Sequence, residues 1–179
     1  MIPLITQTPR LQILAASRAL LTAELHKPHY FSVLLGAALP THWPPGHYTP
    51  AAMHHQLEQL TAGGRTAAGW YGWLALRNAE GDTPRTLVGA GGFLGPPDAA
   101  GTAEIEFSVA ADWRGQGLGT ELVAGLVQQA AATGMVRRLV ARVAAGTQVA
   151  QRVLLRNGFV AGEATGDKQR FERVVEAVG

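Results

Sequence analysis

The chain has 179 residues, of which 47% are hydrophobic and 16% charged, and its net charge is +2 at pH 7. This composition excludes a disordered chain and predicts one folded domain, residues 1–179, with a substantial core. The absence of cysteine excludes disulfides, thiolate metal sites and a cysteine-bound acyl intermediate. The small charge, with no dense Lys/Arg patch, does not suggest nucleic-acid binding. No long apolar run or signal peptide is evident, so we expect a cytoplasmic protein that does not bind membranes.

Hydrophobic periodicity and turn residues predict the order of the elements. In chain order these are a strand at 11–14, helices at 17–25 and 28–35, a loop at 39–48, a helix at 51–60, strands at 71–77, 86–94 and 103–110, a helix at 120–132, a strand at 138–143, a helix at 148–156, and a hairpin of strands at 159–163 and 169–176. Early helices, an antiparallel meander and a later strand–helix unit predict an α+β fold, a mixed sheet in layers with helices.

The most informative segment is 112–120, which reads Asp-Trp-Arg-Gly-Gln-Gly-Leu-Gly-Thr. It places Arg114, Gly117 and Gly119 in an Arg-x-x-Gly-x-Gly array between a predicted strand and a predicted helix. Glycines there let the backbone approach a ligand, and the helix N-terminus offers unpaired N–H groups with partial positive charge. The segment therefore predicts a site for a phosphate or pyrophosphate.

Three kinds of glycine-rich loop compete for this segment. A nucleotide-triphosphate loop needs a Gly-Lys-[Ser/Thr] ending, and no lysine occurs here. A dinucleotide loop needs its third glycine one place later and an acidic residue about 20 residues on, where Arg137 and Arg138 lie instead. The pyrophosphate loop of acyl-coenzyme A N-acyltransferases, [Gln/Arg]-x-x-Gly-x-[Gly/Ala], matches in full.

The chain as a whole resembles the GNAT superfamily of acetyl-coenzyme A-dependent N-acetyltransferases. The specific motifs are Ala-Glu-Ile-x-Phe at 103–107, the glycine loop, and Arg-Val-x-x-x-x-Gly-Phe at 152–159. Thr-Pro-Arg-Leu at 8–11 is similar to the branch that acetylates the N-termini of ribosomal proteins. The resemblance implies a mixed, mostly antiparallel sheet of about six to seven strands flanked by helices. It also implies a V-shaped splay between the fourth and fifth strands.

The resemblance further implies acetyl-coenzyme A as cosubstrate and no metal. The backbone of the fourth strand would pair with the pantetheine arm, and the amides of the glycine loop would hold the pyrophosphate. The residues implied in cofactor binding are Phe107, Ser108, Val109, Arg114, Gly115, Gln116, Gly117, Leu118, Gly119, Thr120 and Thr147. Thr147 stands where family members often have asparagine.

The late motif also carries a departure from the family. Leu154 stands where a tyrosine commonly protonates the leaving thiolate. Two functions therefore stay open. The first is an N-acetyltransferase that acts by direct transfer in a ternary complex on a primary amine, either a protein N-terminus or a small molecule. The second is a non-catalytic protein that binds or senses acyl-coenzyme A.

Two carboxylates on the fourth strand are candidates for the general base that a protonated amine needs. Strand alternation puts Glu104, Glu106 and Ser108 on one face. Glu104 matches the family's base in position and is the first choice, with Glu106 second. The alternative is that both carboxylates merely solvate an exposed sheet face. The Val109 N–H is a candidate to polarise the thioester carbonyl.

The loop before the third helix is a candidate for acceptor contacts, because the family's early helices form the acceptor wall. Its candidate residues are His42, Trp43, His47 and Tyr48, with plain packing as the alternative. No metal site is expected, because no acidic partner lies near His26 and His29, and the adjacent His54 and His55 point to different sides of a helix. Dimers are common in the family, which makes a homodimer one expectation.

Overall fold

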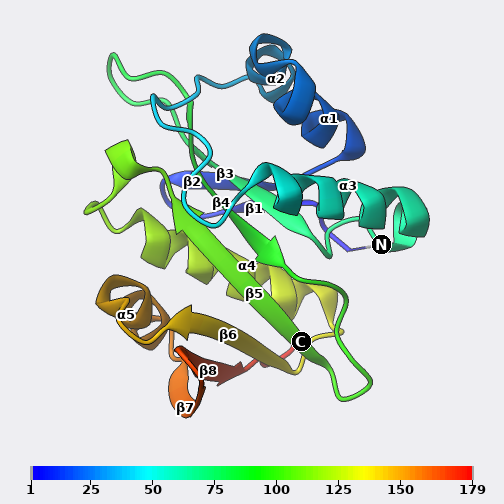
Figure 1. Cartoon of the computed structure of the whole chain (residues 1–179), viewed down its shortest axis with the longest axis vertical. Coiled ribbons are helices and arrows are strands. Elements are labelled where there is room, and N and C mark those ends of the chain that lie inside the picture. The colour runs from blue at the N-terminus through cyan, green and yellow to red at the C-terminus, as the bar shows by residue number, and fades with distance from the viewer. Residues whose placement is uncertain (1, 179) are drawn as a thin grey trace.

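The computed structural model describes residues 2–178, which form one sheet of eight strands with helices on both faces (Figure 1). The strands are β1 (Ile5–Gln7), β2 (Leu11–Ala15), β3 (Gly72–Arg77), β4 (Thr86–Phe93), β5 (Thr102–Val109), β6 (Arg138–Ala144), β7 (Val160–Thr165) and β8 (Lys168–Val174). The α-helices are α1 (Arg18–His26), α2 (Pro28–Leu35), α3 (Pro50–Gly63), α4 (Leu118–Thr133) and α5 (Gln148–Arg156), and two short 3-10 turns are η1 (Gly64–Thr66) and η2 (Ala111–Trp113).

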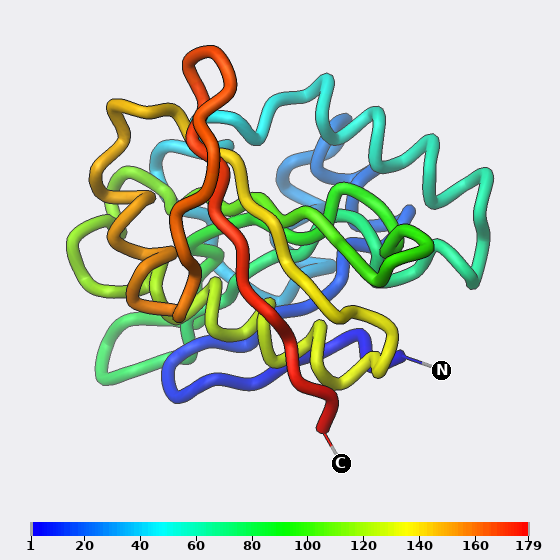
Figure 2. Tube along the Cα trace, turned by 90° about the horizontal axis from the view of Figure 1, so that it is seen from below, coloured from blue at the N-terminus to red at the C-terminus, as the bar shows by residue number. Residues whose placement is uncertain are grey.

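The strands are ordered β1-β2-β3-β4-β5-β6-β8-β7, and neighbouring strands are antiparallel except for β5 and β6, which are parallel. Figure 2 shows β6 and β8 running side by side across the molecule. The expected mixed, mostly antiparallel sheet is confirmed. The sheet has one strand more than the sequence predicts, because β1, a three-residue edge strand paired with β2, was not foreseen.

Two hydrophobic clusters cover the two faces of the sheet. On one face, α4 and α5 pack through residues such as Leu122, Leu126 and Leu154. On the other face, α1, α2 and α3 pack through residues such as Leu21 and Phe31. Because alternate residues of a strand face opposite sides, Trp73 enters the first cluster and Leu74 the second. Within the described residues, no helix combines the length and apolar character that a membrane span requires.

The parallel pair β5–β6 opens partway along its length. Its register runs from Thr102 opposite Arg138 to Ile105 opposite Ala141 and then stops. Beyond that point β5 continues to Val109 beside β4, and β6 continues to Ala144 beside β8. Figure 1 shows the two strands diverging toward their arrowheads. The expected V-shaped splay is thus present, and it exposes one edge of β5.

Candidate active site

The exposed edge of β5 carries the backbone groups of Phe107 and Val109. Hydrogen bonds from Ala110 N to Val88 O (2.8 Å) and from Leu94 N to Glu104 O (2.9 Å) fix which β5 residues face β4. Since the facing direction alternates along an antiparallel strand, Phe107 and Val109 turn their N–H and C=O groups the other way, into the splay.

The same alternation changes one sequence-based assignment. Ser108 lies opposite Ala90, and its backbone groups face β4, so they are not available to a ligand in the splay. The sequence prediction grouped Ser108 with Phe107 and Val109 because motif position alone does not distinguish the two edges of a strand. Only the Ser108 side chain remains available, on the face that it shares with Glu104 and Glu106.

The glycine loop begins where β5 ends. Arg114 Nε donates a hydrogen bond to Val109 O (3.1 Å), which ties the loop to the last residue of the strand. Gly115 and Gly117 both have φ of +77°, a left-handed conformation that favours glycine. A Cβ on Gly119 would lie 3.5 Å from the side chains of Val109 and Val153, which leaves room for a small residue only.

Helix α4 begins directly after Gly117, two residues earlier than the sequence indicates. The first helical residues, Leu118 to Thr120, therefore have N–H groups without partners inside the helix. Leu118 is buried in the core, so only its backbone can serve a ligand. Asn157 Nδ2 donates to Thr120 O (3.1 Å) and to Val153 O (2.9 Å), and so fastens the start of α4 to α5.

Thr147 lies at the N-cap of α5, in the segment that follows β6. Its side chain is exposed and makes no capping hydrogen bond. It thus stands beyond the end of β6, the strand that forms the other side of the splay from β5.

Glu104 and Glu106 project from the same face of β5 but have different surroundings. Glu104 lies in the paired part of the strand, opposite Val140, and forms an ion pair with Arg142 of β6. Glu106 lies just beyond the last β5–β6 pair. Partial burial raises the pKa of the Glu106 carboxyl above its ordinary value; His47 opposes that rise, Glu104 adds to it and Lys168 opposes it. The Glu106 side chain still reaches solvent.

The loop at 39–48 is anchored to α1 by the carboxylate of Glu24, which no sequence motif marks. Glu24 accepts hydrogen bonds from Trp43 Nε1 (2.7 Å) and from Tyr48 Oη (2.6 Å). Burial of the Glu24 carboxyl raises its pKa, although both hydrogen bonds act in the opposite direction. Trp43 and Tyr48 also contact each other edge to face, with ring centroids 5.8 Å apart. The polar atoms of both aromatic residues are thus used within the protein.

The two histidines of this loop remain accessible. His42 Nδ1 lies 3.2 Å from Asp112 Oδ1, so the loop reaches the turn η2 that leads into the glycine loop. His47 is exposed and close enough to Glu106 to influence its pKa. The structure therefore separates the four predicted acceptor-loop residues into two that pack on Glu24 and two that border β5 and its loop.

Leu154 is completely buried in the cluster beneath α4 and α5. Its position is therefore part of the core, and nothing there can donate a proton to a leaving group.

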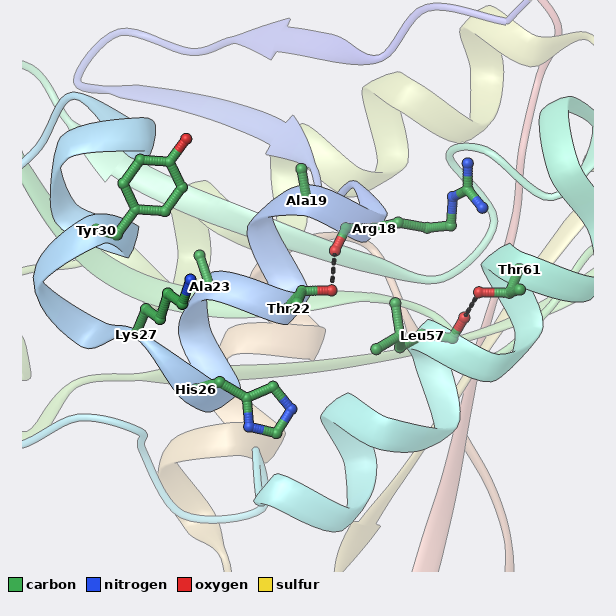
Figure 3. Close-up of a pocket in the computed structure, with 9 residues that line it drawn as sticks. All are labelled: Arg18, Ala19, Thr22, Ala23, His26, Lys27, Tyr30, Leu57 and Thr61. Carbon is green, nitrogen blue, oxygen red and sulfur yellow. Dashed lines mark hydrogen bonds between the residues drawn. The ribbon is translucent and has the colours of Figure 1, made fainter.

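Two hollows are separate from the splay. One of about 600 Å³ lies between α1, the start of α2 and α3, lined by residues that include Arg18, His26 and Tyr30 (Figure 3). Another of about 260 Å³ lies under the 39–48 loop and includes Glu24 and Trp43. Neither is lined by β5 or by the glycine loop, whereas the chemistry-bearing residues gather at the splay.

Comparison with known families identifies the family of this fold. The family model described as an acetyltransferase (GNAT) domain matches residues 18–160. This chain belongs to the GNAT acetyltransferase family. It is therefore an acetyltransferase by family, and the sequence-based expectation of this fold and class is confirmed.

Solved structures share the GNAT fold of this chain over nearly its whole length. RimL, a ribosomal-protein α-N-acetyltransferase in complex with coenzyme A, is 19% identical, with 99% of each chain covered and a TM-score of 0.66. A ribosomal-protein-S5-alanine acetyltransferase from Vibrio fischeri is 14% identical, with 97% of each chain covered and a TM-score of 0.65. MccE, a microcin C7 self-immunity acetyltransferase in complex with acetyl-CoA and AMP, is 13% identical, with 94% of each chain covered and a TM-score of 0.60. The comparison with curated proteins finds no match.

Proposed function

We propose that this GNAT protein, acting as one domain, transfers an acetyl group from acetyl-coenzyme A to a primary amine by direct transfer in a ternary complex. The observation that carries the proposal is the open edge of β5, which ends in a loop with two left-handed glycines before a helix N-terminus. An extended pantetheine arm can add to such an edge as a strand does, and a helix N-terminus suits a pyrophosphate. Direct transfer is the simpler proposal, because the chain contains no cysteine to form a cysteine-bound acyl intermediate.

In this proposal Phe107 holds the pantetheine arm through its backbone N–H and C=O, and Val109, whose C=O accepts a hydrogen bond from Arg114, contributes its N–H alone. The loop from Arg114 to Thr120 surrounds the pyrophosphate, with N–H groups of Gln116, Gly117 and Gly119 available to it. Thr147 contacts the cofactor from the far side of the splay. The Val109 N–H donates to the thioester carbonyl oxygen and stabilises the charge that develops there.

Glu106 is the general base that we propose, ahead of Glu104. Glu104 is occupied by Arg142, whereas Glu106 lies at the mouth of the splay with a raised pKa. The Glu106 carboxylate takes the proton of the acceptor ammonium, directly or through a water. The neutral amine then forms its bond to the acetyl carbon, and the carbon–sulfur bond breaks. Because Leu154 is a core residue, solvent supplies the proton for the departing sulfur, and solvent also takes the second proton that the nitrogen loses as the amide forms.

The acceptor in this proposal is a cation before it loses its proton. Glu106 lies on the face of β5 that His47 of the 39–48 loop approaches, and its carboxylate favours a positively charged group, whereas Glu104 is already paired with Arg142. Solved structures that share this fold include ribosomal-protein acetyltransferases, which makes a peptide N-terminus the first acceptor to test. Small-molecule amines form the second panel. His42 and His47 are the accessible loop residues that would meet the acceptor.

The test compares Glu106→Gln with Glu104→Gln, using thiol release from acetyl-coenzyme A with both panels of amines. We expect Glu106→Gln to lower kcat by about 100-fold or more, while coenzyme A affinity stays within about twofold. In the unmodified protein, kcat/KM rises with pH as the Glu106 carboxyl ionises, and this rise disappears in Glu106→Gln. Unchanged turnover and an unchanged pH profile in Glu106→Gln would remove Glu106 from this role.

A second function, binding or sensing acyl-coenzyme A without catalysis, is favoured by the burial of Leu154 in place of an acid. It predicts calorimetric binding of acetyl-coenzyme A with no thiol release from any amine of either panel. Acetylated product at any acceptor decides against it.

A further inference from the structure

The turn between β1 and β2 reaches across to the glycine loop through one arginine. Arg10 Nη1 donates a hydrogen bond to Gln116 O at 2.9 Å, and Arg10 Nε donates to Glu121 Oε2 at 2.7 Å. One guanidinium group therefore holds both the loop and the first turns of α4, although more than a hundred residues separate it from them. The proposed mechanism leaves Arg10 without a role.

The contact with Gln116 determines which way the next amide points. In a trans peptide, the C=O of one residue and the N–H of the following residue point in opposite directions. Because Arg10 draws the Gln116 carbonyl toward the β1–β2 turn, the Gly117 N–H points away from that turn. Gly117 has φ of +77° and is the N-cap of α4, so this amide adjoins the free N–H groups of the helix start.

Glu121 fixes the guanidinium in place. Its carboxylate accepts hydrogen bonds from Arg10 N (2.6 Å), from Arg10 Nε and from Thr8 Oγ1 (2.7 Å). Burial alone would raise the pKa of Glu121, but these hydrogen bonds together lower it, so the group is held as a carboxylate. A carboxylate near the N-terminus of α4 would repel an anionic ligand, and the Arg10 charge beside it offsets that repulsion.

We propose that Arg10 is a positioning residue for the pyrophosphate loop: anchored by Glu121, it holds the Gln116–Gly117 peptide with its N–H directed to the phosphate site. This inference rests on the proposed function, because it takes the loop to bind the pyrophosphate of coenzyme A. Arg10 acts from behind the loop and does not itself contact the phosphates.

The test measures coenzyme A affinity by calorimetry for Arg10→Ala and Arg10→Lys. We expect Arg10→Ala to raise Kd by about tenfold, a change of about 1.4 kcal/mol in binding free energy. Arg10→Lys should show most of the same loss, because one ammonium group cannot reproduce the forked contact with both acceptors. Arg18→Ala is the matched control: it removes the same charge from α1, on the other face of the sheet, and should leave Kd within twofold.

Glu121→Gln tests the anchor of Arg10. If Glu121 holds the guanidinium in place, its replacement loosens the loop, and amide exchange at residues 115–120 of the unliganded protein becomes faster, as in Arg10→Ala. Because Glu121→Gln also removes a negative charge near the helix start, exchange rather than Kd is the readout for this variant. Unchanged exchange at residues 115–120 in Glu121→Gln, or an Arg10→Ala Kd within twofold of the unmodified protein, overturns the proposal.

A second measurement keeps this inference distinct from the proposed function. Amide hydrogen exchange at residues 115–120 of the unliganded protein reports the order of the loop without any cofactor. We expect faster exchange there in Arg10→Ala and unchanged exchange in Arg18→Ala. If the unmodified protein fails to bind coenzyme A while Arg10→Ala still accelerates exchange, the proposed function fails and the positioning role stands. Unchanged exchange in Arg10→Ala refutes the positioning role.

Discussion

Replacement of Gly117 by alanine tests whether the glycine loop binds coenzyme A, separately from its contribution to the stability of the fold. Gly117 has φ of +77° at the N-terminal end of α4, and Gly134 has φ of +69° at the C-terminal end of the same helix. A Cβ on Gly117 would lie 3.4 Å from Arg10 Nη2, an ordinary van der Waals contact, and a Cβ on Gly134 would meet nothing within 4 Å. The two sites therefore impose nearly the same backbone strain, but only Gly117 belongs to the loop.

The expected loss of stability follows from that conformation. An alanine in the left-handed region destabilises the folded state by about 1–2 kcal/mol. The same alanine lowers the conformational entropy of the unfolded chain, which offsets about 0.4–1 kcal/mol of that loss. Both Gly117→Ala and Gly134→Ala should thus lower the free energy of unfolding by about 1 kcal/mol. For a chain of this length that corresponds to a Tm lower by about 2–4 °C, measurable by thermal or denaturant unfolding.

The affinity for coenzyme A should distinguish the two variants. In Gly117→Ala, relief of the strain turns the peptide bonds next to residue 117, so the amides that would face the pyrophosphate move. We expect Kd by calorimetry to rise about tenfold or more in Gly117→Ala and to stay within twofold in Gly134→Ala. If both variants lose the same stability and both keep full affinity, the loop does not hold the pyrophosphate, and the assignment of its amides is wrong.

Two further predictions concern the interior. Leu154→Ala should lower the free energy of unfolding by about 2–5 kcal/mol, because Leu154 is fully buried in the cluster under α4; a denaturant titration that shows less than 1 kcal/mol would contradict this packing. Glu24→Gln should change how stability depends on pH: since the folded-state pKa of Glu24 is raised, its contribution is fully present below the unfolded value and is lost as pH rises through the folded value. The stability of the unmodified protein relative to Glu24→Gln should therefore be greatest in acid and fall with rising pH, and a parallel pair of pH–stability curves would argue against the buried carboxyl.

The parts of the fold that the sequence could predict are those with local patterns. The helix at 51–60 was expected close to its observed bounds, and Thr49 is its N-cap, with its side chain accepting a hydrogen bond from Ala52 N at 3.2 Å. The glycine loop was likewise expected between a strand and a helix, because its motif is contiguous. The sequence predicts the start of α4 two residues too late, because a left-handed Gly117 rather than a polar side chain precedes the helix.

The parts that the sequence could not predict depend on pairs that are distant along the chain. Glu24 was not singled out because its partners Trp43 and Tyr48 lie on another element. Arg10 lies in the Thr-Pro-Arg-Leu motif at 8–11, but no sequence pattern connects it with Glu121. The edge strand β1 spans three residues, too few for alternation to be recognised. The environments of Glu104 and Glu106 also depend on a distant pairing, because they differ only through the register of β5 with β6.

The short paired segment of β5 and β6, in which Thr102–Ile105 lie opposite residues 138–141, also bears on how the chain folds. Strands β1 to β5 pair in the order in which they occur along the chain, so the sheet up to Val109 is built from neighbours in sequence. Once α4 has covered this half, β6, α5, β7 and β8 join it through Thr102–Ile105 and the core beneath α4 and α5. During synthesis, the N-terminal half can thus collapse before the C-terminal half has left the ribosome, because its strand pairs need no later residue.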